Sequence, residues 1–515
     1  MPIRLSGLIS GMDTETLIKD LMEAQRLKNK KVEDKQTLLT WKQEKWKELN
    51  TKLYKLYTED LNKMQLQGSY NTKKVTSSND SFVSVTADNT APEGAHSLVI
   101  NSLAKSQFVT GGKITADKDD NPINPSASTK LEDLGITAGT KILLGTAGKV
   151  KTLTVTADTT IKSFIDTAKK AGMNASFDTT QKKIFLSSVQ SGTSNSFQIS
   201  AKDENGEDAN ALLGKLGLDA LKADGTRVDP DSDKSIVVPA SDSDVIYNGA
   251  RITGSSNVIS VNGLKLTLKG ADINQTISLN ITKDTQAAYD MVKNFVKNYN
   301  AVLTELNSLY YADTAKGYDP LSDDEKEAMT EEQINKWETK IKDSILRRDT
   351  TLGSLMDVMR TSLMSAVKVN DKSYALSSFG IETSSDYLER GLLHIYGDSE
   401  DTVYSAMDDK LKKALEEDPA TVIEALSGIS KKLYDQMYDK MRSIPNVRSA
   451  LTFYNDKLMV EQQRKYTKQI DIQEKKLIEL ENKYYKQFAA MESAMSKMQS
   501  QSSQLAAMMG IGNSQ

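Results

Sequence analysis

The chain has 515 residues, a net charge of −4, no cysteine and only two histidines, His96 and His394. This length predicts several structural units rather than one core, and interspersed charges of both signs argue against a nucleic-acid-binding protein. The lack of cysteine excludes disulfides, thiol catalysis and thiolate metal sites, and two distant histidines without a nucleophile motif argue against a Ser-His-Asp triad or a histidine-rich metal site.

No membrane or secretion signal is present in the sequence pattern. No stretch reaches the apolar length of a membrane span, and residues 1–10 are too short and too polar for the apolar core of a signal peptide. By this criterion alone the chain is cytoplasmic. The lack of cysteine also suits a chain that passes unfolded through a narrow export channel.

A long amphipathic helix is predicted near the N-terminus. Asp13 or Thr14 is expected to cap it, and its pattern continues to about Leu66. Apolar residues in this helix recur at a seven-residue step, which is typical of a coiled-coil seam. The residues at this step are Val32, Leu39, Trp46 and Leu53.

From Tyr70 the period of apolar residues becomes that of β-strands. Strands are expected at 97–100, 245–247, 258–261, 264–268 and 277–281, and alternation is clear over 74–87. A stretch rich in Gly, Asn, Asp and Pro at 111–128 is expected to be a loop or linker. A separate strand and helix module follows, with its helix at 161–171.

Two short segments in this region imitate ligand sites. Asp229, Asp231 and Asp233 have the spacing of the first three calcium-loop ligands, but Lys234 and Ala240 replace the turn glycine and the bidentate glutamate. The glycines at 145 and 148 fail as a phosphate loop, since Val150 follows the lysine. We therefore expect no metal, no cofactor and no enzymatic activity.

The second half of the chain is predicted to be helical. Helices are expected at 287–310, 323–346, 351–367, 399–415 and 419–426, and a terminal helix from Leu451. A second heptad seam follows in that terminal helix. Its residues are Ile470, Leu477, Tyr484, Met491, Met498 and Leu505.

The two terminal helices are expected to need a partner. Burying each seam side chain is worth about 1.5 to 3 kcal/mol, while ordering the backbone costs about 1 to 2 kcal/mol per residue, so an isolated helix of this kind is marginal. We expect the two helices to pair with each other, with copies of themselves or with a third protein.

These elements predict an α+β multidomain chain. Long terminal α-helices form a coiled-coil stalk and helical leg, and two mainly β head domains are inserted between them. The predicted domains are 1–40 with 461–515 (terminal coiled coil), 41–70 with 284–460 (helical leg), 71–110 with 241–283 (β head) and 111–240 (inserted variable head).

Several stretches spread over the chain contain motifs of one known protein family. They are Gly7–Asp13 with Leu17–Met22, Pro92–Ala104, 153–200, Tyr247–Val258, Leu264–Gly270, Phe379–Ile381 with Gly391–Leu393, and Ala414–Val422. In these stretches the chain resembles the flagellar filament cap protein family, also called hook-associated protein 2, and 153–200 is similar to the insert of flagellins and hook proteins. The stretches follow the family's order, although Gln25-Arg26-Leu27 stands where the family usually has a proline.

The resemblance implies a structural role outside the cell. Family members form a ring, commonly of five subunits, at the distal end of the flagellum, where they retain exported flagellin so that it folds and inserts. Implied partners are copies of the chain, flagellin, hook-filament junction proteins and a cytoplasmic export chaperone that binds the C-terminal helix; nucleic acid and membrane insertion are not implied. The resemblance also implies export through the flagellar type III pathway without a cleaved signal peptide.

Contacts with the filament or with neighbouring subunits are expected at apolar residues near the N-terminus, which have little core to enter. These residues are Leu5, Leu8, Ile9, Ile18 and Leu21. The methionines of the C-terminal seam are soft side chains that tolerate changing neighbours. An alternative role is a lateral filament component or a flagellum-borne adhesin for cell adhesion, acting through the variable head domain.

Overall fold

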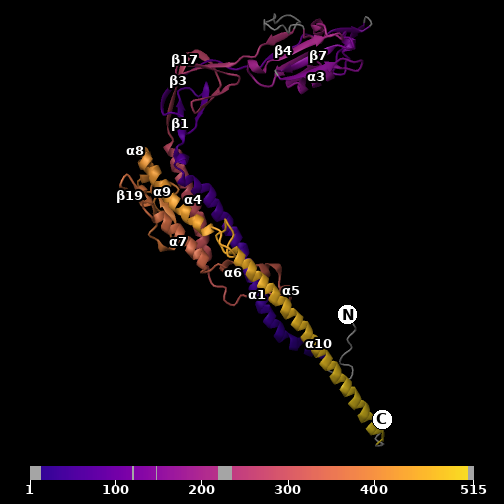
Figure 1. Cartoon of the computed structure of the whole chain (residues 1–515), viewed down its shortest axis with the longest axis vertical. Coiled ribbons are helices and arrows are strands. Elements are labelled where there is room, and N and C mark those ends of the chain that lie inside the picture. The colour runs from indigo at the N-terminus through magenta and orange to yellow at the C-terminus, as the bar shows by residue number, and fades with distance from the viewer. Residues whose placement is uncertain (1–12, 119–120, 147, 219–234, 509–515) are drawn as a thin grey trace. The chain divides into compact units, whose positions relative to one another are not determined.

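The computed structural model describes residues 13–118, 121–146, 148–218 and 235–508. The chain divides into two compact units (Figure 1). Met1–Tyr70 and Thr285–Gln515 form what we call the helical unit, and Asn71–Asp284 form the β unit. The predicted α+β class, with long terminal helices and β domains between them, is confirmed. The finer division into four domains stays a prediction.

The first long helix of the helical unit is α1 (Thr14–Lys55). Asp13 caps it, because its carboxylate accepts a hydrogen bond from the backbone N–H of Thr16 at 3.1 Å. The helix continues through one π-helical turn (Leu56–Leu61) into α2 (Asn62–Gln65). The predicted end near Leu66 matches the point where the backbone becomes extended.

The core of the helical unit is shared by the second half of α1, its continuation into α2 and four other helices. These are α4 (Thr285–Tyr310), α7 (Thr350–Met364), α8 (Lys410–Glu417) and α9 (Pro419–Met441). Their apolar faces bury one contiguous cluster that includes Trp46, Leu53, Leu303, Leu352 and Leu426. The terminal helix α10 (Asp456–Met508) begins beside this core, directly after the buried residues Phe453 and Tyr454.

The helix predicted at 399–415 is wrong over residues 399–409, since α8 begins only at Lys410. Aspartate side chains hold the preceding residues in turns. The carboxylate of Asp401 accepts hydrogen bonds from the backbone N–H groups of Val403 and Tyr404, and that of Asp398 accepts one from Glu400. Such local bonds compete with helix formation.

A short helical segment between α4 and α7, Tyr311–Arg348, packs against α1; we call it the clip. It contains α5 (Asp323–Glu327) and α6 (Glu331–Ser344), so the single helix predicted at 323–346 is divided. Thr330 starts α6 with a capping box, which explains the break. Lys30 Nζ of α1 lies 2.7 Å from Glu325 Oε2, and Lys342 Nζ lies 4.7 Å from the ring centre of Trp41.

Acid is expected to loosen the clip. Hydrogen bonds from Lys30 and Ser322 lower the pKa of Glu325 to about 2. A lowered folded-state pKa stabilises the clip above the ordinary glutamate pKa of 4.5, and this stabilisation is lost as the pH falls towards 2. Trp41 and Trp337 should therefore change their fluorescence over that window, while the far-UV circular dichroism stays constant.

The matched control for this titration is Glu325→Gln, which keeps the size of the side chain and removes its titration. This variant should show the emission of the loosened clip already at neutral pH and a smaller transition below pH 4.5, which is left to Glu338 of α6. Burial raises the pKa of Glu338, but hydrogen bonds from Lys326 and Lys342 outweigh burial, so that this pKa is lowered. A titration curve identical to that of the parent protein would contradict the role of Glu325.

Two small hairpins complete the helical unit. They are formed by β18 (Val367–Val369) with β19 (Lys372–Tyr374), and by β20 (Ile381–Thr383) with β21 (Leu393–Ile395).

One part of the β unit is built from two antiparallel sheets, with the strand orders β1-β17-β3-β13-β14 and β15-β16-β2. Alternating side chains such as Leu98, Val245, Leu266 and Leu279 fill the core. The strands are β1 (Lys73–Ser77), β2 (Val83–Ala87), β3 (Gly94–Ser102), β13 (Ser243–Tyr247), β14 (Ala250–Gly254), β15 (Val258–Val261), β16 (Leu264–Leu268) and β17 (Asp272–Lys283).

The other part has its own core, in which Phe164 of α3 (Ile161–Lys170) packs with residues of sheets β12-β4-β10-β9 and β11-β7-β8. The predicted loop 111–128 contains a small β5-β6 hairpin. The strands are β4 (Phe108–Thr110), β5 (Ala116–Lys118), β6 (Asn121–Ile123), β7 (Lys141–Thr146), β8 (Lys149–Thr154), β9 (Met173–Asp178), β10 (Lys183–Ser188), β11 (Phe197–Lys202) and β12 (Ile236–Val238).

Candidate interaction surface

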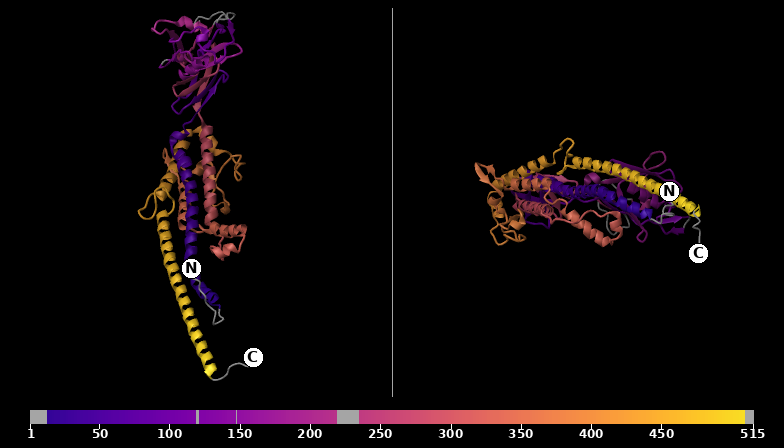
Figure 2. Two further views of the ribbon diagram at one scale, coloured as in Figure 1. Left: turned by 90° about the vertical axis from the view of Figure 1, so that its right-hand side faces the viewer. Right: turned by 90° about the horizontal axis from the view of Figure 1, so that it is seen from below.

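The helices α1 and α10 lie side by side as an antiparallel pair (Figures 1 and 2). The ring of Trp46 stacks on that of Tyr454 with 5.6 Å between ring centres. Further out, Gln463 Nε2 donates a hydrogen bond to Thr40 Oγ1 at 3.0 Å, and Gln36 Nε2 donates one to Thr467 Oγ1 at 2.8 Å. Of the pairings open to the terminal helices, the structure contains the intrachain one.

The predicted seam residues of α1 lie on its covered side. Trp46 and Leu53 are fully buried, Val32 is buried and Leu39 is half-buried. Trp46 and Leu53 belong to the core of the helical unit. Near the start of the helix, Ile18 and Leu21, both predicted as partner contacts, differ: Ile18 is 2% exposed, whereas Leu21 is 46% exposed.

The predicted seam of α10 divides into two halves. Ile470, Leu477 and Tyr484 are half-buried. If the pairing of Gln36 with Thr467 is continued along both helices, Thr14 lies opposite residue 489, so α10 extends past the start of α1 (Figure 2). The later seam residues Met491, Met498 and Leu505 are accordingly 37%, 62% and 58% exposed.

We call the exposed end of the α10 seam the distal stripe; it comprises Met491, Met498, Leu505 and Met508. The stretch from Ser493 to Met508 contains one charged residue, Lys497, among serine, glutamine, alanine, methionine and one leucine. A helix of this composition loses little charge solvation when it is surrounded by other helices. The distal stripe is therefore suited to a partner helix.

Other predicted positions fall elsewhere. Leu5, Leu8 and Ile9, together with the calcium-like segment Asp229–Asp233, lie outside the described residues. Over the described ranges, no cluster of histidine, aspartate and glutamate is arranged to hold a metal ion. None of the helices in those ranges combines the length and apolar character needed to span a membrane.

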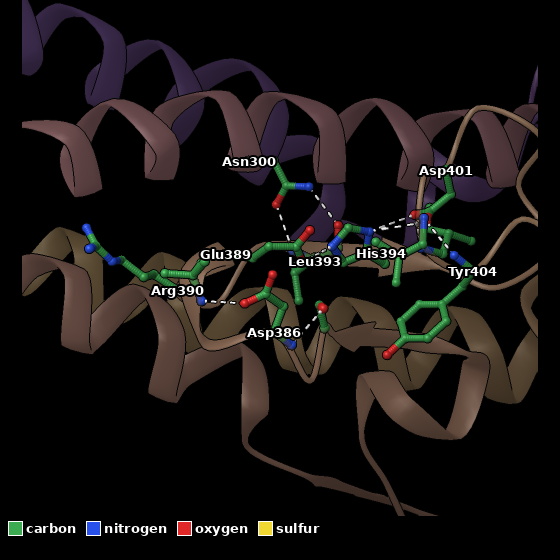
Figure 3. A network of polar contacts seen from close by, with 12 residues as sticks. Asn300, Asp386, Glu389, Arg390, Leu393, His394, Asp401 and Tyr404 are labelled. Atoms are coloured by element: carbon green, nitrogen blue, oxygen red, sulfur yellow. Dashed lines mark hydrogen bonds and ion pairs between the residues drawn. The ribbon is translucent and has the colours of Figure 1, made fainter.

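His394 has a place in the structure that the sequence did not indicate. It lies between two carboxylates, with Nε2 2.9 Å from Glu389 Oε2 and Nδ1 3.1 Å from Asp401 Oδ2 (Figure 3). Burial is the largest single influence on the pKa of Asp401 and raises it. The backbone hydrogen bonds that Asp401 accepts, together with His394, outweigh burial, so that the pKa of this carboxyl is lowered. Nearby, Asn300 bonds both backbone groups of Leu393. The network fixes the β20-β21 loop on α4.

Sequence reasoning missed a polar series on α1 that has the same seven-residue step as the apolar seam. Each member of the series lies three positions before an apolar seam residue. The members are Asn29, Gln36, Gln43 and Asn50. Asn29 is buried, and Asn50 holds the turn before α10, accepting from the backbone N–H of Phe453 at 2.8 Å. A search for polar as well as apolar heptads would have found the series.

A second surface lies in the β unit, on the outer face of sheet β12-β4-β10-β9. Phe108 and Phe185 are 50% and 38% exposed there, and they line a groove of about 690 Å³. The polar side chains of Asn174 and Lys169 also line it. The alternation of apolar and polar residues in these strands did not predict that aromatic side chains would be exposed.

Comparison with known proteins gives consistent matches. The family profile described as flagellar hook-associated protein 2 N-terminus matches residues 10–107, and that described as flagellar hook-associated protein 2 C-terminus matches residues 240–500. A flagellar hook-associated protein 2 from Halalkalibacterium halodurans is 29% identical over 448 residues, which cover 83% of this chain and 79% of the relative.

More distant proteins match as well. A B-type flagellar hook-associated protein 2 from Pseudomonas aeruginosa is 23% identical over 376 residues, covering 70% of this chain and 68% of the relative. The crystal structure of the D1-D2-D3 domains of the flagellar cap protein FliD from Escherichia coli aligns with 77% of this chain and 95% of its own, at 20% identity and a TM-score of 0.49.

Proposed function

Because the chain belongs to the flagellar hook-associated protein 2 family, which consists of structural flagellar cap proteins, we propose that it caps the distal end of the filament as a ring of identical subunits. In this role it retains exported flagellin at the filament tip and promotes its folding and insertion. The observation that carries the proposal is the family match at both ends of the chain, over residues 10–107 and 240–500.

The terminal helix pair supports a leg that contacts the filament. The distal stripe of α10 offers methionine and leucine side chains to a partner, and the exposed Leu21 of α1 adds a further apolar residue. Methionine adapts to neighbours of different shape, which suits a contact that must be remade each time a subunit is added. In our proposal, 1–40 with 461–515 are the leg end, and Leu5, Leu8 and Ile9 take part in the same contacts.

Export and partners follow from the same assignment. We propose that the chain leaves the cell by the flagellar type III pathway without a cleaved signal and that a cytoplasmic chaperone covers its C-terminal helix beforehand. The exposed apolar residues Met498 and Leu505 support such a cover, because an uncovered apolar stripe promotes aggregation. Hook-filament junction proteins are the neighbours expected before the filament grows.

One observation favours a second role for the inserted head. The groove lined by Phe108 and Phe185 exposes aromatic surface that the fold of the β unit does not need. It supports the alternative in which the chain is a lateral filament component or an adhesin.

Immunogold electron microscopy on intact cells of the bacterium that encodes the chain tests both roles. Antibody raised against residues 71–284 should label filament tips, with a strain that lacks the gene as the control. Label along the filament shafts would instead support the alternative role, and label found only in lysed cells would refute both.

A further inference from the structure

The seam between α1 and α10 changes character along its length. Close to the core it is apolar, with Trp46 stacked on Tyr454. Beyond the core it contains two reciprocal polar pairs. Each helix supplies a glutamine four residues before a threonine, Gln36 before Thr40 and Gln463 before Thr467, and each glutamine amide donates to the threonine of the opposite helix.

Both threonines are satisfied on their own helix as well. Thr40 Oγ1 donates to the carbonyl of Gln36 at 3.1 Å, and Thr467 Oγ1 donates to the carbonyl of Gln463 at 3.1 Å. The hydroxyls therefore keep a hydrogen bond when the helices separate, and each glutamine amide gains water in place of threonine. Neutral bonds of this kind contribute little net free energy to pairing.

Part of the polar seam is not satisfied by pairing. Within the described residues, the carboxamide oxygens of Gln463 and Gln473 are buried without a hydrogen-bond partner. Asn29 is also buried in the outer seam. Burial of a carbonyl oxygen without a partner is unfavourable, and separation of the helices would return it to water. The outer seam thus mixes buried apolar residues such as Ile18 and Val32, which favour pairing, with polar groups that gain little from staying closed.

The apolar residues of α10 point to a second arrangement. Their seven-residue step runs without a break from Ile470 through Leu477 and Tyr484 into the distal stripe, although α1 covers only the first part. A single continuous stripe is typical of a helix with one partner along its whole length. The half-buried state of these three residues beside α1 agrees with an incomplete cover.

We infer that residues 14–36 of α1 form a detachable strap, which closes over the first half of the α10 stripe and swings away to expose it during assembly. The boundary lies at the polar pairs, because α1 joins the core of the helical unit only on one side of them, from Trp46 onwards. The ion pair of Lys30 with Glu325 also holds the strap; because both side chains are partly exposed, it supplies a modest share of the free energy of closing, which is lost when Glu325 is neutral.

Hydrogen–deuterium exchange on the full chain tests whether the strap opens. Amides in 14–30 should exchange at least about 100-fold faster than those in 46–55, which need unfolding of the core to open. Glu325→Gln should speed exchange in the strap alone. Equal protection of the two segments would overturn the inference, and this measurement does not depend on the proposed function.

A sealed variant separates opening from simple instability. Asn29→Leu, Gln36→Leu and Gln473→Leu together replace polar seam residues by apolar ones and should slow exchange in 14–30 at least about tenfold, because apolar seams pair more tightly. Thr51→Leu, Gln469→Leu and Asn482→Leu, at exposed positions of the same helices, form the matched control. Unchanged strap exchange in the sealed variant would refute the role of the polar seam.

A reversible clamp tests whether opening is needed at the filament; this arm rests on the proposed function. The chain has no cysteine, so Gln25→Cys with Ile478→Cys, accessible positions set opposite by continuing the Gln36–Thr467 pairing, can be joined specifically by a cleavable thiol cross-linker. The joined protein should fail to cap filaments and should regain capping after cleavage. Normal capping by the joined protein would overturn the strap, whereas failure of the unmodified protein to cap would instead refute the proposed function.

Discussion

Replacing Trp46 by alanine is expected to destabilise the helical unit by about 3 to 5 kcal/mol, the range for deleting a large aromatic side chain from a packed core. Trp46 is 0% exposed, and it lies at the point where α1, the start of α10 and the core of the helical unit meet. Its loss removes the stacking with Tyr454 and leaves a cavity that rigid helices cannot close.

Urea unfolding followed by circular dichroism at 222 nm measures this effect. Within the described residues of the β unit, α3 is the one α-helix, so the helical signal reports mainly on the helical unit. Trp41→Ala is the matched control on the same helix. Trp41 is half-buried and contacts Lys342, and its replacement should cost about 1 kcal/mol or less. Equal costs for the two variants would show that Trp46 is not a core residue.

Deleting residues 490–515 is expected to abolish capping while the helical unit stays folded. The deletion removes the distal stripe, whose residues Met498 and Leu505 are more than half exposed, and leaves the part of α10 that α1 covers. Surface residues of this kind change folding free energy by about 0.5 kcal/mol or less. We therefore expect the deletion to weaken binding to the partner and to leave the folding free energy of the helical unit almost unchanged.

The measurement is the partition of flagellin between filaments and medium in a strain that lacks the chromosomal gene. With the shortened chain, most flagellin should appear in the medium as monomer. In the full-length chain, Met491→Ser with Met498→Ser and Leu505→Ser should reproduce this result, whereas Lys497→Ser with Gln504→Ser, on other positions of the helix, should not. Normal filaments on cells with the shortened chain would refute the role of the distal stripe.

The heptads of both terminal helices were predictable, because burial along a helix seam selects apolar residues at a fixed step. The step does not encode where the partner helix begins. Val32 and Ile470 were therefore placed on seams, but nothing in the sequence distinguished Tyr484, which α1 covers in part, from Met498, which lies past its end. Whether these seams bind other proteins stays a prediction.

Other differences arise from side chains that act locally on the backbone. Asp398 and Asp401 form turns where helical periodicity alone predicted a helix, and Thr330 starts a new helix inside a continuous amphipathic pattern. The capping box of Thr330 with Gln333 was a readable signal. The neighbours of His394 were not readable, because Glu389 and Asp401 meet it only after the β20-β21 hairpin has folded.

The pairing of β1 with β17 has a consequence for engineering. Lys73 lies opposite Lys283 in an antiparallel ladder, so the chain enters and leaves the β unit through neighbouring strands, with Cα atoms about 5 Å apart. The two ends of the β unit therefore lie next to each other, as in a domain that is inserted into a loop of another. A foreign domain with similarly adjacent termini, spliced between Tyr70 and Thr285, can replace it without stretching either connection, which makes the helical unit a carrier for displayed cargo.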